Sequence, residues 1–300
     1  MRSRSPQAIG CLCLGIFLFS IQDLVLKFLS GTYPVTQAMT IRAVVALPIL
    51  SFLVWASTGT TSLRSPRMIL LIVRAVTAFG AYLCYYMAVA ALPLADAVAL
   101  SFVAPLMIAG LAILVLGESL TWPTLAALVA GLVGVVIILR PGEALFEWAA
   151  LLMLLSAGLY STAQVLARKL GDSDSAQVIT FYQNLAFILI APLLAILFRV
   201  GDFSHRNHPS LDFLTRPWTV PSLRDFLLMA ACGVIFSVGM TLISQAYRLA
   251  RAARVSVFEY SAILWAPLWG FVFFSEVPHI TTVVGAAIIC GAGLLTVRRT

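Results

Sequence analysis

The sequence predicts an all-α, polytopic membrane protein with ten transmembrane helices arranged as two inverted five-helix repeats. Three observations lead to this prediction: charge is scarce, the apolar runs have a regular length, and one phrase recurs in both halves. Of the 300 residues, 61% are hydrophobic and 10% are charged, which leaves too little polar surface to cover a water-soluble globule of this size. The five cysteines lie within apolar runs, so we expect no disulfide framework.

Clusters of charge, proline and glycine divide the chain into ten apolar pieces of about 20 residues, the length that crosses roughly 30 Å of hydrocarbon. Continuously apolar runs of this length favour helices, because barrel strands would alternate over about ten residues. The predicted spans are residues 8–29, 35–57, 68–92, 94–116, 121–140, 146–168, 177–200, 225–249, 254–275 and 279–297. We expect the one long connection, residues 201–224, to be a surface crossover.

The distribution of Lys and Arg predicts the orientation of the chain in the membrane. If the amino terminus is cytoplasmic, the inner loops hold more Lys and Arg than the outer loops. This asymmetry predicts an even number of spans in the cytoplasmic (inner) membrane, with both termini in the cytoplasm. Because topology explains the net charge of +7, we do not expect nucleic acid to be a partner.

A phrase at residues 114–120 recurs 158 residues later, and this carries Glu118 onto Glu276. Each glutamate ends one span and precedes the next, so the phrase marks the same joint in two repeats, residues 1–142 and 143–300. Since each repeat has five spans, an odd number, the second must be inverted relative to the first. Inverted repeats of this kind hold substrate near the midplane where the halves meet. The two glutamates lie on opposite membrane faces, so we expect them to cap helices or pair with loops.

Several short motifs in both halves extend this symmetry into a family pattern. They are Ala95–Ala97, Pro105, Leu116–Glu118 and Gly131–Gly134 in the first half, and Phe258–Ala262 and Ser275–Pro278 in the second. In these motifs the chain resembles, over essentially its whole length, the drug/metabolite transporter superfamily in its ten-span form with two EamA-type halves. Ser275 departs from the family's usual Gly before Glu. The chain is also similar to YddG-type amino-acid exporters, a resemblance that implies export of amino acids, aromatic ones among them, and of related small solutes.

We therefore expect a secondary transporter that works by alternating access, because no phosphate-binding loop or ATPase segment is present. The alternatives are a carrier of another small metabolite or drug-like compound and, less favoured, an integral membrane enzyme. His205 and His208 have the spacing of metal ligands, but they lie in the long polar loop without a Cys or carboxylate cluster. We expect no metal and no other cofactor. Small solutes and the lipid bilayer are the expected partners, and the oligomeric state stays open, with a monomer compatible.

Aromatic side chains recur at helical spacing in two of the predicted spans. Tyr82, Tyr85 and Tyr86 share one face of the span 68–92, and Trp265 and Trp269 share one face of the span 254–275. Such faces suit a cavity for amphipathic solutes, because they offer apolar area and a few hydrogen-bonding groups. The alternative is packing against lipid or within the core. We select Tyr82, Tyr86, Trp265 and Trp269 as candidate substrate-binding residues.

Polar side chains within apolar spans are candidates for function, because they are unfavourable there unless they pair or face water. Gln164, Gln183 and Gln245 are predicted to offer hydrogen bonds to a zwitterion, with helix-to-helix association as the alternative. Arg42 lies about 10 Å inside its span on a helical rise of 1.5 Å per residue, and Arg74 is placed similarly. Either arginine could hold a substrate carboxylate, and Arg42 is the candidate that we select; snorkelling to the interface is the alternative for both.

Two prolines fall near the middle of predicted spans, where a proline removes a helical hydrogen bond. Pro105 and Pro267 are therefore candidate hinges, with ordinary packing in membrane helices as the alternative. The carboxylates within reach of a central cavity are Asp23, Asp96 and Glu259. None lies squarely at a midplane, so the sequence leaves coupling to protons open.

Overall fold

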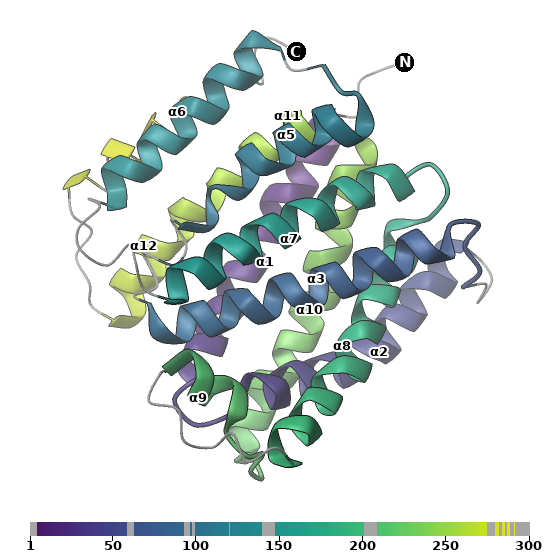
Figure 1. The fold of residues 1–300 in the computed structure, drawn as a ribbon, viewed down its shortest axis with the longest axis vertical. Coiled ribbons are helices and arrows are strands. Elements are labelled where there is room, and N and C mark those ends of the chain that lie inside the picture. The colour runs from purple at the N-terminus through teal and green to yellow at the C-terminus, as the bar shows by residue number, and fades with distance from the viewer. Residues whose placement is uncertain are drawn as a thin grey trace.

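In the computed structural model the chain forms a bundle of helices (Figure 1). The structure describes residues 5–58, 63–92, 97, 100–119, 121–139, 148–200, 209–274, 280–281, 284–285, 287–288 and 291. Within these ranges every regular element is a helix and there is no strand. The predicted all-helical fold class is confirmed.

Among the described residues, six helices are long and apolar enough to cross a membrane. They are α1 (Ser5–Leu29), α2 (Val35–Thr58), α3 (Met68–Ala91), α7 (Trp148–Leu170), α8 (Ala176–Val200) and α10 (Leu223–Leu249). Two shorter apolar helices, α5 (Ala104–Leu116) and α6 (Trp122–Leu139), fall within predicted spans. The chain is a multi-pass membrane protein, and its helices fit ten spans, although most of the last span, 279–297, lies outside the described residues.

The second part of the predicted crossover, 209–222, packs on one end of the bundle. It carries a short helix, α9 (Pro209–Thr215), and then runs past the connection between α1 and α2. Trp218 Nε1 donates to Thr36 Oγ1 (3.0 Å), and Gln37 Nε2 donates to the carbonyl of Thr219 (2.6 Å). Ser222 then caps α10 by accepting from the backbone N–H of Asp225. This end of the bundle is therefore held by hydrogen bonds between the two halves of the sequence.

Two predicted spans, 94–116 and 254–275, are interrupted. In the first, the helix breaks at residues 102–103 and α5 starts again with Pro105 in its first turn, where a proline fits because its missing N–H is not needed. In the second, α11 (Ala252–Val255) and a 3₁₀ helix, η2 (Ser256–Ser261), precede α12 (Ala262–Phe274). At the offset of 158 residues, the first break aligns with the end of η2.

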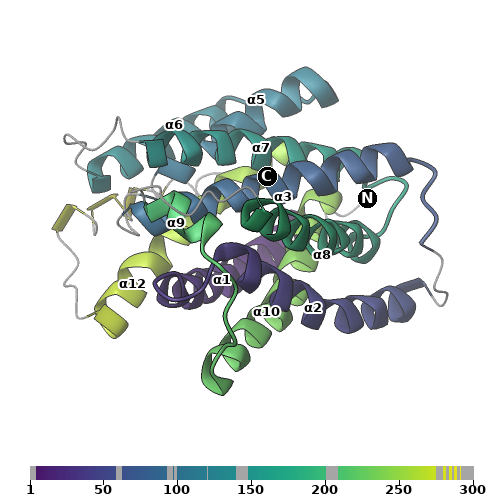
Figure 2. The same ribbon diagram turned by 60° about the horizontal axis from the view of Figure 1, so that its bottom comes forward.

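The long helices pack in pairs that join the two halves: α1 with α10, α2 with α8, and α3 with α7. Figure 2 shows α1 lying against α10 and α12. Small residues permit this close approach, as is usual in membranes. A Cβ atom added at Gly15 would lie 2.9 Å from the carbonyl oxygen of Gly239, and one added at Gly233 would lie 2.7 Å from the carbonyl oxygen of Arg42.

Glu118 connects the halves at the other end of the bundle. Its carboxylate accepts hydrogen bonds from the backbone N–H groups of Ala252 and Ala253 (3.2 Å each) at the start of α11, and it lies 3.7 Å from Arg168 Nε. The expectation that this glutamate caps a helix is confirmed; Glu276 lies outside the described residues. We refer to Glu118, Arg168, Ala252 and Ala253 as the Glu118 clamp.

The close contact between α1 and α10 predicts that Gly15→Ala destabilises the protein. The new methyl group would overlap the Gly239 carbonyl and force the two helices apart. Overpacking of this kind lowers the free energy of unfolding by about 1–3 kcal/mol. Thermal unfolding in detergent, monitored by size-exclusion chromatography, should show a lower midpoint temperature for Gly15→Ala than for the wild-type protein. Gly10→Ala is the control on the same helix, because nothing lies within 4 Å of its added Cβ. Equal midpoints for the two variants would contradict this account of the packing.

Candidate functional site

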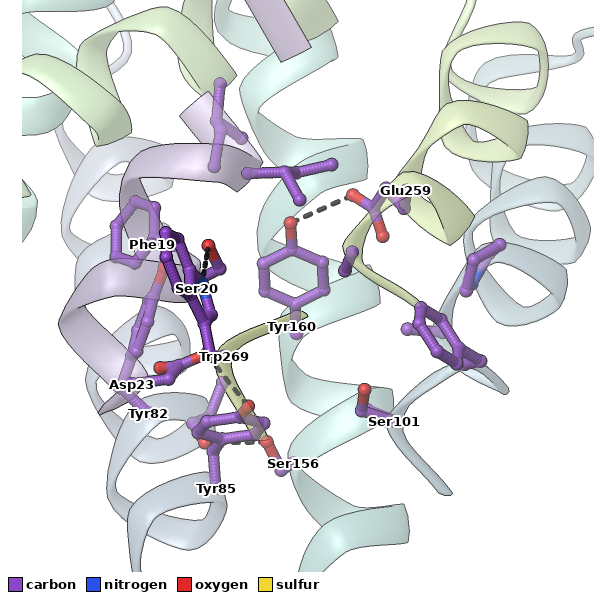
Figure 3. Close-up of a pocket in the computed structure, with 18 residues that line it drawn as sticks. Phe19, Ser20, Asp23, Tyr82, Tyr85, Ser101, Ser156, Tyr160, Glu259 and Trp269 are labelled. Carbon is purple, nitrogen blue, oxygen red and sulfur yellow. Dashed lines mark hydrogen bonds between the residues drawn. The ribbon is translucent and has the colours of Figure 1, made fainter. Parts of the chain in front are cut away.

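A central cavity opens among α1, α3, α5, α7, α10, η2 and α12, so that both halves of the chain contribute to its walls (Figure 3). Two carboxylates line it, Asp23 on α1 and Glu259 on η2. Hydroxyl groups come from Ser20, Tyr82, Tyr85, Ser101, Ser156 and Tyr160. Aromatic area comes from Phe19, Phe102 and Trp269 together with these tyrosines. Among the described residues that line the cavity, none is Lys, Arg or His.

Glu259 is held by two tyrosines from different helices. Its carboxylate accepts a hydrogen bond from Tyr160 Oη on α7 (2.9 Å; Figure 3) and another from Tyr247 Oη on α10. The side chain belongs to the 3₁₀ segment η2 and is only 7% exposed. A buried carboxylate is unfavourable without such donors, so the two hydroxyls keep Glu259 at the cavity wall.

Asp23 is held by tyrosines in the same way. Tyr85 Oη donates to Asp23 Oδ2 (3.1 Å) and Tyr86 Oη donates to Oδ1 (3.3 Å). The Tyr86 hydroxyl also lies 2.7 Å from the side-chain amide of Gln22. Of the predicted tyrosines, Tyr82 lines the cavity, whereas Tyr86 lies behind the wall and fixes Asp23.

The predicted tryptophans also divide between the wall and the layer behind it. Trp269 lines the cavity and donates through Nε1 to Ser20 Oγ (3.0 Å). Trp265 packs on Phe17, with ring centroids 4.6 Å apart, and its buried Nε1 finds no hydrogen-bond partner among the described residues. Only Trp269 can therefore touch a solute in the cavity in this conformation.

None of the three predicted glutamines lines the cavity. Gln183 is fully buried and accepts from Arg74 Nη1 (2.9 Å), and Gln245 accepts from Arg248 Nη1 (2.7 Å). Gln164 is 1% exposed, and no hydrogen-bond donor reaches its Oε1 among the described residues. Gln183 therefore links two helices, while Gln245 pairs within its own helix.

Both arginines predicted inside spans are 0% exposed, so the snorkelling alternative is wrong for them. The guanidinium carbon of Arg42 lies 4.5 Å from the ring centroids of both Phe187 and Phe236, within the range of cation–π attraction. When the Gln22 amide is oriented to suit its neighbours, its oxygen lies 3.2 Å from Arg42 Nη1. Arg42 does not line the cavity, so its predicted contact with a substrate carboxylate requires another conformation.

Of the predicted hinges, Pro105 lines the cavity at the start of α5. Pro267 lies within α12, but its side chain is not among those that the structure describes. Asp96, His205 and His208 lie outside the described residues. Prediction from the sequence overlooked Tyr247, Ser101 and Ser156. The two serines carry the same signal as the glutamines, a polar side chain within an apolar span, and that signal would have found them.

Comparison with known proteins identifies the family of the chain. The EamA-like transporter family matches the chain twice, over residues 7–140 and 147–298. The chain belongs to the EamA-like transporter family. The predicted resemblance is confirmed, and the protein is a transporter and not an enzyme.

Relatives of this EamA-like transporter handle different small metabolites. The pseudopaline exporter of Pseudomonas aeruginosa is 29% identical over 278 residues, which cover 92% of this chain and 90% of the exporter. A riboflavin transporter of Rhizobium johnstonii is 30% identical over 70% of this chain and 63% of its own length. An S-adenosylmethionine uptake transporter of Rickettsia prowazekii is 22% identical over 95% of this chain and 90% of its own length. A protein of known crystal structure shares the fold, with a TM-score of 0.74 at 18% identity over 97% of both chains.

The cavity predicts that Ser101 is reachable by a small polar reagent. In a variant that lacks the five native cysteines, Ser101→Cys should react with a methanethiosulfonate reagent at least about tenfold faster than a buried thiol, because reaction requires access to the thiolate. Ser237→Cys is the control, since Ser237 is 0% exposed and does not line the cavity. The rates can be followed by mass spectrometry, and equal rates at both positions would contradict the cavity.

Proposed function

We propose that this EamA-like transporter is a secondary transporter that exports amino acids, including aromatic ones, and related small solutes across the inner membrane. The observation that carries this proposal is the central cavity, where two tyrosine-held carboxylates lie beside aromatic rings. The ammonium group of an amino acid matches Asp23 or Glu259 by charge. An aromatic or apolar side chain matches Phe19, Phe102 and Trp269.

The absence of basic residues from the described cavity wall supports a solute with a positive group. An anion without an ammonium group would meet two carboxylates at low dielectric with no basic side chain on the described wall, which is unfavourable. A zwitterion or an organic cation brings its own positive charge to this wall. Amino acids are therefore favoured over simple anionic metabolites.

Two features support a pair of repeats, residues 1–142 and 143–300; five spans in each repeat would invert the second, and the distribution of Lys and Arg favours both termini in the cytoplasm. The family matches the chain once in each half. The interruptions at residues 102–103 and at the end of η2 align at the same offset as the repeated Glu118 phrase. Interrupted helices at a repeat interface are the usual site of substrate binding in such transporters.

Alternating access is supported by the positions of the cavity and the Glu118 clamp. On α7, Tyr160 lines the cavity and Arg168 belongs to the clamp, eight residues or about 12 Å further along the helix. The clamp closes one end of the bundle while the cavity lies away from it. Transport would require the clamp to separate, with Pro105 and Pro267 as hinges beside the interrupted segments.

A carrier of another small metabolite is the second candidate. It is favoured by the relatives named for pseudopaline, riboflavin and S-adenosylmethionine, since transporters of this family differ in their solutes. A counterflow screen in liposomes that includes amino acids, flavins and sulfonium compounds decides between the candidates. Exchange of a flavin or a sulfonium compound without any amino acid would overturn the first proposal.

Trp269→Ala should lower amino-acid counterflow by about tenfold without lowering the abundance of the protein, because it removes aromatic area and a hydrogen-bond donor from the cavity wall. Trp55→Ala is the control, since Trp55 is 53% exposed on α2 and does not line the cavity. Transport is measured with radiolabelled phenylalanine in proteoliposomes of matched protein content. A loss of abundance with unchanged transport per molecule would assign Trp269 to packing alone.

A further inference from the structure

A second polar cluster lies behind the cavity and takes no part in the site described above. It consists of Arg74 on α3, Thr180 and Gln183 on α8, and Ser244 on α10, and we refer to it as the Arg74 centre. All four side chains are 0% exposed. Arg74 Nη1 donates to Gln183 Oε1 (2.9 Å) and Nη2 to Ser244 Oγ (3.4 Å), while the hydroxyl oxygens of Ser244 and Thr180 are 3.3 Å apart.

The Arg74 centre has unused hydrogen-bond donors and an unbalanced charge. Arg74 Nε and Gln183 Nε2 are buried and have no acceptor among the described residues. The guanidinium donates to a neutral amide and a neutral hydroxyl, and in the described part of the chain no carboxylate forms an ion pair with Arg74. A buried cation is strongly unfavourable unless an anion balances it. Arg42 differs, because it interacts electrostatically with Asp23.

The Arg74 centre shares two helices with the wall of the cavity. Arg74 lies on α3 about two turns before Tyr82, which lines the cavity. Ile243, which precedes Ser244 on α10, lines it as well. The Tyr82 hydroxyl is held by a contact of 3.7 Å to Met240 Sδ, a weak acceptor. Tyr82 can therefore move with little loss of hydrogen bonding, and access from the cavity to the buried centre requires a movement of this kind.

We propose that the Arg74 centre binds the carboxylate of the transported solute. The inference rests on the proposed function and adds the second half of the recognition: Asp23 and Glu259 bind the ammonium group, and Arg74 with Gln183 donates to the carboxylate. A guanidinium and an amide N–H together match the two oxygens of a carboxylate. The solutes selected this way carry both charges, as α-amino acids do. A small inorganic anion such as chloride has the same requirement for donors and positive charge. The test therefore distinguishes a solute carboxylate from an inorganic anion at this centre.

The test compares phenylalanine with 2-phenylethylamine, which lacks the carboxylate, in counterflow with proteoliposomes. The wild-type protein should exchange phenylalanine at least about tenfold faster, the value of one charge-assisted hydrogen-bonded contact. Arg74→Gln should lower the exchange of phenylalanine to that of the amine and leave the amine within about twofold of its wild-type rate. Arg74→Lys should restore part of the preference. Arg64→Gln is the control, because Arg64 is exposed outside the spans.

The preference for phenylalanine over the amine is the deciding readout. A variant Arg74→Gln that slows both probes equally, or that keeps the preference, overturns the proposal and assigns Arg74 to structure. If Arg74→Gln does not fold, Gln183→Met replaces it, since this variant removes the free amide donor at similar volume and should lower the preference. Replacement of chloride by gluconate should leave the preference unchanged. A chloride-dependent exchange of both probes would assign the centre to an inorganic anion and overturn the proposal.

Failure of the proposed function gives a different pattern. A wild-type protein that exchanges neither phenylalanine nor 2-phenylethylamine, but exchanges another solute, would overturn amino-acid transport and the carboxylate proposal together. A wild-type protein that exchanges both probes at equal rates would keep the cavity as the transport site and overturn the Arg74 proposal alone.

Discussion

Burial of charge within an apolar helical bundle is the constraint on which the site depends. Asp23, Arg42, Arg74 and Glu259 all lie within the helical bundle, and hydrogen bonds from tyrosines hold both carboxylates. Charges in such surroundings are tolerated only when polar groups or opposite charges hold them. Neutral hydroxyl and amide groups fill this role on every side, which leaves the charges available to a solute. The close helix contacts through glycine keep these groups within reach of one another.

The sequence predicted the helices well and their interruptions poorly. The ends of the long helices follow from the length of apolar run that a membrane requires, and α3 was expected at 68–92 and is found at Met68–Ala91. The break before Pro105 and the 3₁₀ helix η2 depend instead on tertiary contacts. Glu259 is held by tyrosines on α7 and α10, and no local pattern in the sequence encodes these contacts.

The candidate site was predicted in part, for a related reason. Helical spacing places residues on one face, so Tyr82 and Trp269 were found, but spacing cannot tell which members of that face reach the cavity. Tyr86 accordingly lies behind the wall. The pairing of Arg74 with Gln183 joins residues 109 positions apart, and only the packing of α3 on α8 brings them together. Charged residues within apolar spans indicated candidate site residues in the sequence. The structure was needed to show which partners each charged side chain has.

In the proposed site, two carboxylates at the cavity and the Arg74 centre would offer a zwitterion the opposite of each of its charges. A structure determined with bound phenylalanine tests this arrangement most directly. The expected result places the ammonium group within hydrogen-bond distance of Asp23 or Glu259 and the ring against Trp269, with the carboxylate directed toward Arg74. Phenylalanine bound outside the cavity, or with its ammonium group turned away from both carboxylates, would contradict this account.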